Sequence, residues 1–190
     1  MYIESKTDTE RTLAVEKILE DIPGGGVVEK DDLPTSSSGI KEGSLMSKGS
    51  DGIWHLTKTA MVANALSTND THLVVHNEHE FVVGDYIGIP AETASGVAIT
   101  AITASGTGLD VITATWPGAD VAASGLIVAV TGLGLSPMKY SPEAVAVNSV
   151  DKDDNNQGCG LMVRGRVRLG RMPYFSDATL RALLPLVRFV

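Results

Sequence analysis

The sequence has few aromatic side chains: Phe, Trp and Tyr together make up only 5% of the residues. With so few large rings, a core has to be built from Val, Ile, Leu and Ala, and 43% of the residues are hydrophobic. The sequence also holds 20 glycines, which supply many positions where the backbone can turn tightly. Small branched side chains separated by frequent turns favour a mainly β fold.

Cysteine is almost absent as well, since Cys159 is the only one in the sequence. A single cysteine excludes an internal disulfide and any zinc site built from several thiolates. Gly158 and Gly160 leave its backbone sterically open, but the sequence identifies no base that would activate the thiol. We interpret Cys159 as a buried or idle thiol and predict no catalytic residue, no enzymatic activity and no cofactor.

Long apolar runs and a leader pattern are also missing. The most apolar stretch, residues 125–130, is far shorter than the ~20 residues that a membrane-spanning helix needs. The beginning of the sequence lacks a positively charged segment followed by an apolar run and a small-residue cleavage site. We therefore expect synthesis in a cytoplasm and no membrane partner.

Positive charge is scarce and unevenly placed. The formal net charge of −8 disfavours binding to nucleic acid, because affinity for polyphosphate depends on clustered Lys and Arg. From Cys159 to Val190, six arginines stand against one acid, Asp177, so this segment carries +5 and the rest of the chain −13. We expect the basic tail to lie on an acidic surface of the same chain or of a neighbouring copy.

Composition divides the 190 residues into three parts. Residues 1–45 are polar and rich in Gly, Ser and Pro, which predicts an extended N-terminal arm. Residues 46–150 alternate short apolar segments with turn residues and predict a small β-barrel or sandwich body. Residues 151–190 predict a strand-helix-strand segment that docks on the body or on a partner.

Short alternating segments predict the strands of this body. Gly106 and Gly108 mark a hairpin turn between two of them, and Gly84 with Asp85 marks a second turn. The predicted strands are residues 53–59, 71–76, 81–89 on both sides of the second turn, 97–103, 109–115 and 126–131.

The tail has the clearest pattern of all. Residues 161–169 alternate apolar side chains with Met162 and three arginines, which predicts a strand with one buried and one cationic face. Ser176 or Asp177 can cap a short helix that Pro185 ends. Residues 186–190 then predict a last strand, which docks into a sheet or into a groove of a partner.

Two clusters contain residue types that bind metals, but the spacing of the residues in each does not fit a metal site. His72 and His76 would share a strand face, but their Cα atoms would lie ~13 Å apart, and His79 would have to fold back to join them. Residues 151–156 resemble the opening of a calcium loop, but the required glycine and the closing glutamate are both misplaced. We interpret both as solvated segments and predict no metal.

The arginines of the predicted tail strand are the remaining candidate site, an interface with another surface. Three like charges on one strand face repel one another unless acids oppose them, and the chain has a large acidic excess elsewhere. The alternative is a solvated edge strand that its charges protect from aggregation. The predicted interface residues are Arg164, Arg166, Arg168, Arg171, Leu186, Val187, Phe189 and Val190.

Several segments resemble head decoration and head fibre proteins of tailed phages and Bacteroides-type prophages. The resemblance covers roughly residues 40–190. It rests on residues 43–46, 51–60, 71–75, 81–87, 164–169, 172–173, 182–185 and 187–189.

This resemblance implies an auxiliary capsid protein that is made in the cytoplasm of a bacterial host and binds the surface of the virion head. Its implied partners are the major capsid protein and copies of itself in a homo-oligomer, such as a trimer. A tail or baseplate component is one alternative. Another is a carbohydrate-binding β module, with Trp54 and Trp116 as the glycan contacts.

Overall fold

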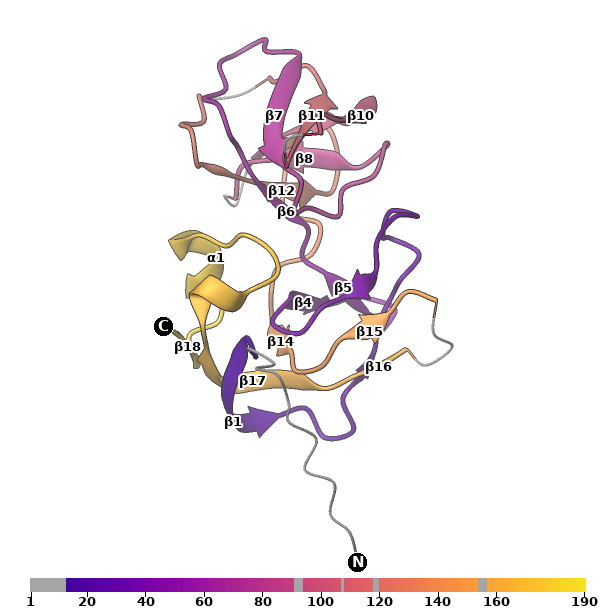
Figure 1. The fold of residues 1–190 in the computed structure, drawn as a ribbon, viewed down its shortest axis with the longest axis vertical. Coiled ribbons are helices and arrows are strands. Elements are labelled where there is room, and N and C mark those ends of the chain that lie inside the picture. Colours follow the sequence, from indigo (N-terminus) through magenta and orange to yellow (C-terminus); the bar gives the residue numbers. More distant parts are fainter. Residues whose placement is uncertain (1–12, 91–93, 107, 118–119, 154–156) are drawn as a thin grey trace, which may run out of the picture.

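The computed structural model describes residues 13–90, 94–106, 108–117, 120–153 and 157–190 of the chain. The fold is mainly β, as the composition predicts, with 43% of the residues in strands and 5% in helices. Two lobes lie one above the other along the longest axis of the molecule (Figure 1). Residues 59–136 form the upper lobe, and the chain on either side of them forms the lower lobe.

The lower lobe holds one large sheet and two small ones. The large sheet has the order β1-β17-β14-β4-β5, and β18 pairs with β17 beside this path. The small sheets pair β15 with β3 and β16 with β2. Its elements are β1 (Val15–Asp21), β2 (Gly26–Val27), β3 (Gly39–Ile40), β4 (Leu45–Lys48), β5 (Trp54–Leu56), β14 (Ala144–Ala146), β15 (Val150–Asp151), β16 (Gly158–Cys159), β17 (Leu161–Val167), the 3₁₀-helix η1 (Leu169–Arg171), α1 (Ala178–Ala182) and β18 (Val187–Phe189).

The upper lobe is a small sandwich of two open sheets. A three-stranded sheet β10-β11-β7 faces a five-stranded sheet β13-β9-β8-β12-β6, and apolar side chains from both sheets fill the space between them. The only fully buried Trp in that core is Trp116. Its strands are β6 (Thr59–Met61), β7 (His72–His76), β8 (Tyr86–Gly88), β9 (Ala94–Ala98), β10 (Ala101–Ala104), β11 (Leu109–Thr113), β12 (Leu126–Val130) and β13 (Gly134–Ser136).

Strand β12 joins the two lobes through an apolar core. Its run of Leu, Ile, Val and Ala does not alternate with polar residues, and all five residues are buried. Ile127 and Ala129 face the upper core, whereas Leu126, Val128 and Val130 pack on residues of the lower lobe. The lobes therefore share a hydrophobic interface on the outer face of β12, which α1 and β18 complete from below.

Most predicted strands of the body are confirmed. Residues 71–76, 109–115 and 126–131 contain β7, β11 and β12, and residues 97–103 span the end of β9 and most of β10. Strands β10 and β11 pair as the predicted hairpin, although residue 107 in its turn lies outside the described residues. The segment before Gly84 is wrong as a strand, because only β8 on the far side of that turn pairs in a sheet.

The strand, helix and last strand predicted for the tail are all present, but the predicted alternation holds only in part. In β17, Leu161, Gly165 and Val167 are buried and Arg164 and Arg166 are exposed. Met162, predicted on the arginine face, is fully buried, and Leu169, predicted to be buried, lies beyond the strand and is exposed. Asp177 caps α1, its side chain accepting a hydrogen bond from the backbone N–H of Leu180 at 2.9 Å. Strand β18 pairs in parallel with β17. Among the described residues no helix is long and apolar enough to cross a membrane.

The extended arm predicted for residues 1–45 is wrong for the part that the structure describes. Strand β1 pairs antiparallel with β17, and β2 and β3 pair with β16 and β15. Val28, Leu33 and Ile40 are isolated in a polar sequence, yet each is buried in the core of the lower lobe. Single apolar residues spaced without a period give no pattern, which is why the composition suggested a linker.

The predicted boundaries at residues 45 and 150 also cut through sheets. Strands β4 and β5 from the predicted body and β17 from the predicted tail belong to the same large sheet. The upper lobe is instead an insertion that leaves this sheet after β5 and returns to it at β14. The docking segment is thus an integral part of the lower lobe.

Candidate interaction surface

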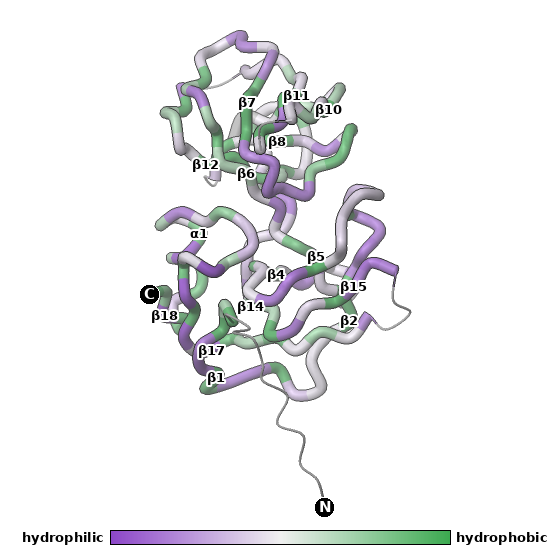
Figure 2. The backbone as a smooth tube through the Cα atoms, in the orientation of Figure 1, coloured by the Kyte–Doolittle hydropathy of each residue, from purple (hydrophilic) through white to green (hydrophobic). Residues whose placement is uncertain are grey.

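The arginines of the tail lie together on one side of the lower lobe. Arg164 and Arg166 point outward from β17, Arg168 follows them, and Arg166 is the register neighbour of Arg188 on β18. The side chains of Arg166 and Arg168 are 47% and 49% exposed. Figure 2 shows hydrophilic residues along this side of the lower lobe. We call these residues, together with exposed Arg171 on η1, the cationic face.

The acid partner of this face comes from the same chain. Glu16 on β1 lies 3.0 Å from Arg166 (Oε2 to Nε) and 3.4 Å from Arg168 (Oε1 to Nη2). Glu20, further along β1, is the register neighbour of Arg164. We expected the arginines to lie on an acidic surface, and β1 supplies part of that surface. The sequence had placed β1 in the predicted N-terminal arm.

One strand cannot neutralise the whole face. Within the described residues, Arg164, Arg171 and Arg188 form no ion pair, so positive charge remains on this side of an acidic protein. Exposed ion pairs such as those of Glu16 contribute only ~0–1 kcal/mol, because water and salt screen them. The face therefore stays available to an acidic partner.

Exposed apolar side chains border the cationic face. Leu186 is 60% exposed, Val190 41% and Leu169 38%, and the backbone N–H of Leu169 donates to the carbonyl of Val190. Val187, by contrast, is buried in the interface between the lobes, and Phe189 is half-buried against it. The predicted interface role is therefore wrong for Val187, because the last strand docks into its own sheet.

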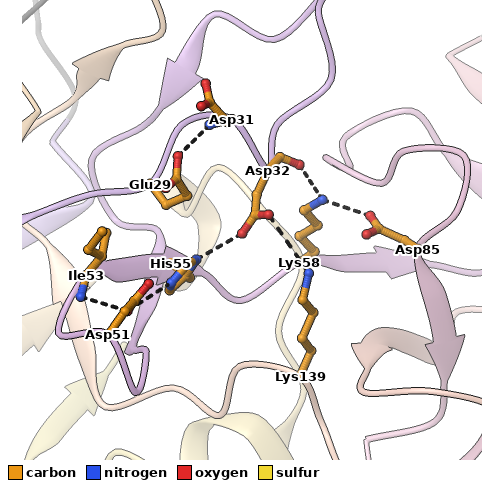
Figure 3. Close-up of polar contacts among 9 residues, drawn as sticks. All are labelled: Glu29, Asp31, Asp32, Asp51, Ile53, His55, Lys58, Asp85 and Lys139. Carbon is orange, nitrogen blue, oxygen red and sulfur yellow. Dashed lines mark hydrogen bonds and ion pairs between the residues drawn. The ribbon is translucent and has the colours of Figure 1, made fainter.

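A second group of charged residues lies at the junction of the lobes (Figure 3). His55 on β5 lies between two acids, with Nδ1 2.9 Å from Asp32 Oδ2 and Nε2 3.7 Å from Asp51 Oδ1. Its ring stacks on Tyr140 at 4.1 Å between centroids. Burial and the negative charge of Asp32 raise the pKa of Tyr140 to about 12.

Lys58 connects this group to the upper lobe. Its side chain is 2% exposed, and Nζ lies 2.8 Å from Asp85 Oδ2, just before β8, while also donating to the backbone carbonyl of Asp32. Burial alone would raise the pKa of Asp32, but the His55 hydrogen bond and the charges of Lys139 and Lys58 lower it overall. These groups satisfy one another, so the cluster holds the lobes together rather than offering a reactive group.

The remaining sequence candidates are not brought together. His72 contacts Thr71, the ring of His76 lies 5.5 Å from Phe175, and His79 is turned inward. In the part of the chain that the structure describes, no three His, Cys, Asp or Glu side chains are grouped to hold a metal. Residues 154–156 of the calcium-like segment lie outside the described residues.

Cys159 and the two tryptophans are packed into cores. Cys159 is 2% exposed, and burial raises the pKa of its thiol, which keeps it protonated. Trp54 is 6% exposed and Trp116 only 1%, so neither ring offers a face to a glycan. The alternative prediction that Trp54 and Trp116 contact a glycan is therefore wrong.

Sequence reasoning missed Lys58, Asp85 and Asp110, which are charged yet mostly buried. No sequence signal singled out Asp110: it shares a strand face with Ile112, but Leu109 and Val111 on the other face are apolar as well, so no alternation marks it as buried. Comparisons of the chain with protein-family models, curated proteins and solved structures found no match. Function therefore has to follow from the chemistry of these surfaces.

Proposed function

We propose that this chain is a virion structural protein: an auxiliary capsid protein that binds the outer surface of a phage head and decorates or stabilises it. The observation that carries the proposal is the cationic face with its apolar border. The resemblance of residues 40–190 to head decoration and head fibre proteins supports the same function.

The charge distribution explains how such a protein would attach. Three arginines of the face form no ion pair with the described residues, while the chain as a whole carries −8. Opposite charges steer two surfaces together, and like charges on the remaining surface disfavour other orientations. A partner with an acidic patch, either the major capsid protein or the acidic surface of another copy, fits this arrangement.

The apolar border would supply the part of the binding energy that salt does not weaken. Leu186 and Val190 expose carbon surface directly beside Arg188, so one partner surface can cover both. Burial of apolar surface contributes about 25 cal/mol per Å². Arg is also enriched at protein interfaces relative to the rest of the surface.

A tail or baseplate component would use the same face for a different neighbour. Assembly therefore distinguishes the two roles. The first experiment mixes the purified protein with phage heads that lack it and measures co-sedimentation at increasing salt. Saturable binding to heads that weakens as salt rises supports the proposal; binding to isolated tails and not to heads overturns it.

A charge-matched pair of variants locates the contact. Arg188→Glu reverses a charge on the cationic face, and Lys48→Glu makes the same change at an exposed position of β4. We expect Arg188→Glu to weaken head binding at least tenfold and Lys48→Glu to leave it nearly unchanged. Equal effects of the two variants would show that net charge, and not this face, controls binding.

A further inference from the structure

A pocket lies between the two lobes, and it is lined by residues outside the cationic face. It has a volume of about 380 Å³, which is within the ~300–1,000 Å³ typical of small-molecule sites. The loop after Leu33 of the lower lobe forms one wall, and the loop between β7 and β8, with Ile102 of β10 and Asp110 of β11, forms the other. The lining residues used below are Thr35, Ser36, Asn77, His79, Val83 and Asp110.

Asp110 occupies an unusual position in this pocket. It lies on β11 as the register neighbour of Val75, and it shares a strand face with Ile112. Val75 and Ile112 are both fully buried in the upper core. A carboxylate therefore stands at the end of an apolar face, with its side chain 17% exposed at the pocket.

His79 lies against this carboxylate. Its side chain is 5% exposed, and Nδ1 accepts a hydrogen bond from the backbone N–H of Phe81 at 3.2 Å. The neutral ring consequently carries its proton on Nε2, which lies 3.2 Å from Asp110 Oδ2. Burial lowers the pKa of His79, so the ring is neutral despite the neighbouring acid.

This tautomer restricts what the pocket can bind. A nitrogen that carries a proton cannot ligate a metal, and a bound anion would meet the charge of Asp110. The Nε2–H group is attracted to Asp110 Oδ2 at 3.2 Å, but it is too poorly aligned to form a full hydrogen bond with any described residue. This close polar contact restricts where the Asp110 carboxylate lies and leaves its acceptor sites open to a ligand.

The groups around the opening both donate and accept hydrogen bonds. The amide of Asn77 and the hydroxyls of Thr35 and Ser36 do both, and the Asp110 carboxylate accepts. Val83, 61% exposed, adds an apolar surface beside them. A ring with several hydroxyl groups on its edge and C–H groups on its face matches this combination.

We propose that this pocket binds a neutral saccharide, with ring hydroxyls on Asp110 and Asn77 and the C–H face of the ring against Val83. His79 is a positioning residue that holds the carboxylate in place. The site is independent of the proposed capsid contact, because none of its residues belongs to the cationic face. It assigns carbohydrate binding to the upper lobe without either tryptophan.

The test titrates isotope-labelled full-length protein with glucose, galactose, mannose and N-acetylglucosamine at millimolar concentrations and follows backbone amide shifts. We expect at least one sugar to produce saturable shifts of Asn77, Val83 and Asp110. Methylammonium and acetate serve as the charged probes. No saturable shift with any of the four sugars, or tighter binding of either charged probe in this pocket, overturns the proposal.

Two variants test the assigned contacts. Asp110→Asn should weaken sugar binding at least tenfold, whereas Asp120→Asn, an exposed acid of the same lobe, should leave it unchanged. Asn77→Ala, at an exposed position, tests the site again if Asp110→Asn fails to fold. Binding by folded Asp110→Asn or Asn77→Ala that equals that of the original protein would overturn the assignment.

A further variant separates positioning from structure at His79. His79→Gln keeps a donor near Asp110, whereas His79→Phe removes it from a ring of similar shape. We expect His79→Gln to retain most of the sugar affinity and His79→Phe to lose it at a similar melting temperature. Equal affinities of the two variants would contradict the positioning role.

Discussion

The protein pairs its charges in two contrasting environments. At the junction of the lobes, Lys58 and Asp85 are almost completely buried and meet at 2.8 Å. On the cationic face, Arg166 and Glu16 lie 3.0 Å apart but are 47% and 30% exposed. The two ion pairs have similar lengths, but loss of the buried pair should destabilise the protein much more. A buried charge that loses its partner cannot be solvated by water, whereas an exposed charge can.

This contrast assigns different roles to the two regions. The buried group fixes how the upper lobe sits on the lower lobe and is not accessible to a partner. The exposed group contributes little to stability, and its arginines can exchange Glu16 for an acid on another molecule at little cost. Breaking each region separately should therefore affect stability in one case and association in the other.

The largest effect is expected from Lys58→Met. This change leaves the carboxylate of Asp85 buried without its cation and should lower the free energy of unfolding by about 3–5 kcal/mol. Urea denaturation monitored by circular dichroism measures it. The double variant Lys58→Met/Asp85→Asn should lose less than the sum of the two single variants; an additive loss would contradict direct coupling of the pair.

The apolar part of the same junction is tested by Leu180→Ala. Leu180 of α1 is fully buried in the core shared by the lobes, so the cavity should cost about 3 kcal/mol of unfolding free energy. Leu183→Ala is the matched control, because Leu183 caps the same helix and is 41% exposed. The control should change stability by less than about 0.5 kcal/mol; equal losses would contradict the assignment.

The pH response of the junction is a smaller effect. Tyr140 has its pKa raised to about 12 from 10.0, so its protonated form contributes stability below pH 10.0, and this stability is lost as pH rises toward 12. Asp32→Asn removes a negative charge beside the phenol and should bring the pKa of Tyr140 closer to 10.0. Tyrosinate absorbance during an alkaline titration, with Tyr140→Phe as reference, measures the shift.

The smallest effect on stability is expected from Glu16→Gln. Removal of this exposed acid should change the free energy of unfolding by at most about 1 kcal/mol, and roughly 1 M salt should abolish the difference. The same variant frees Arg166 and Arg168 and should bind heads more tightly at low salt. A loss of several kcal/mol would show that β1 depends on these ion pairs.

Local patterns predicted the tail because each of its signals lies within a few residues. Alternation around Gly165 gave the buried face of β17, and Asp177 before an apolar helical spacing gave the cap of α1. Strand pairing over long distances left no comparable signal. The pairing of β1 with β17, which supplies Glu16 to the arginines, depends on residues about 150 positions apart.

Buried polar residues were harder to recognise for a related reason. Lys58 and Asp110 look in the sequence like ordinary surface charges, since neither belongs to a recognisable motif. Only the folded chain brings Asp85 to the first and His79 to the second. The candidate pocket could not be predicted because its two walls come from separate lobes, whereas Arg164, Arg166 and Arg168 of the cationic face follow one another at alternate positions of the sequence.

The insertion of the upper lobe between β5 and β14 also constrains the order in which the chain can fold. Strand β1 leaves the ribosome well before β17, its only strand partner among the described residues. Until β17 has been synthesised, β1 therefore remains an unpaired strand that can aggregate with neighbouring nascent chains. Glu16, Lys17 and Glu20 keep the unpaired β1 hydrated. These charges therefore oppose aggregation of the nascent chain before β1 pairs with β17.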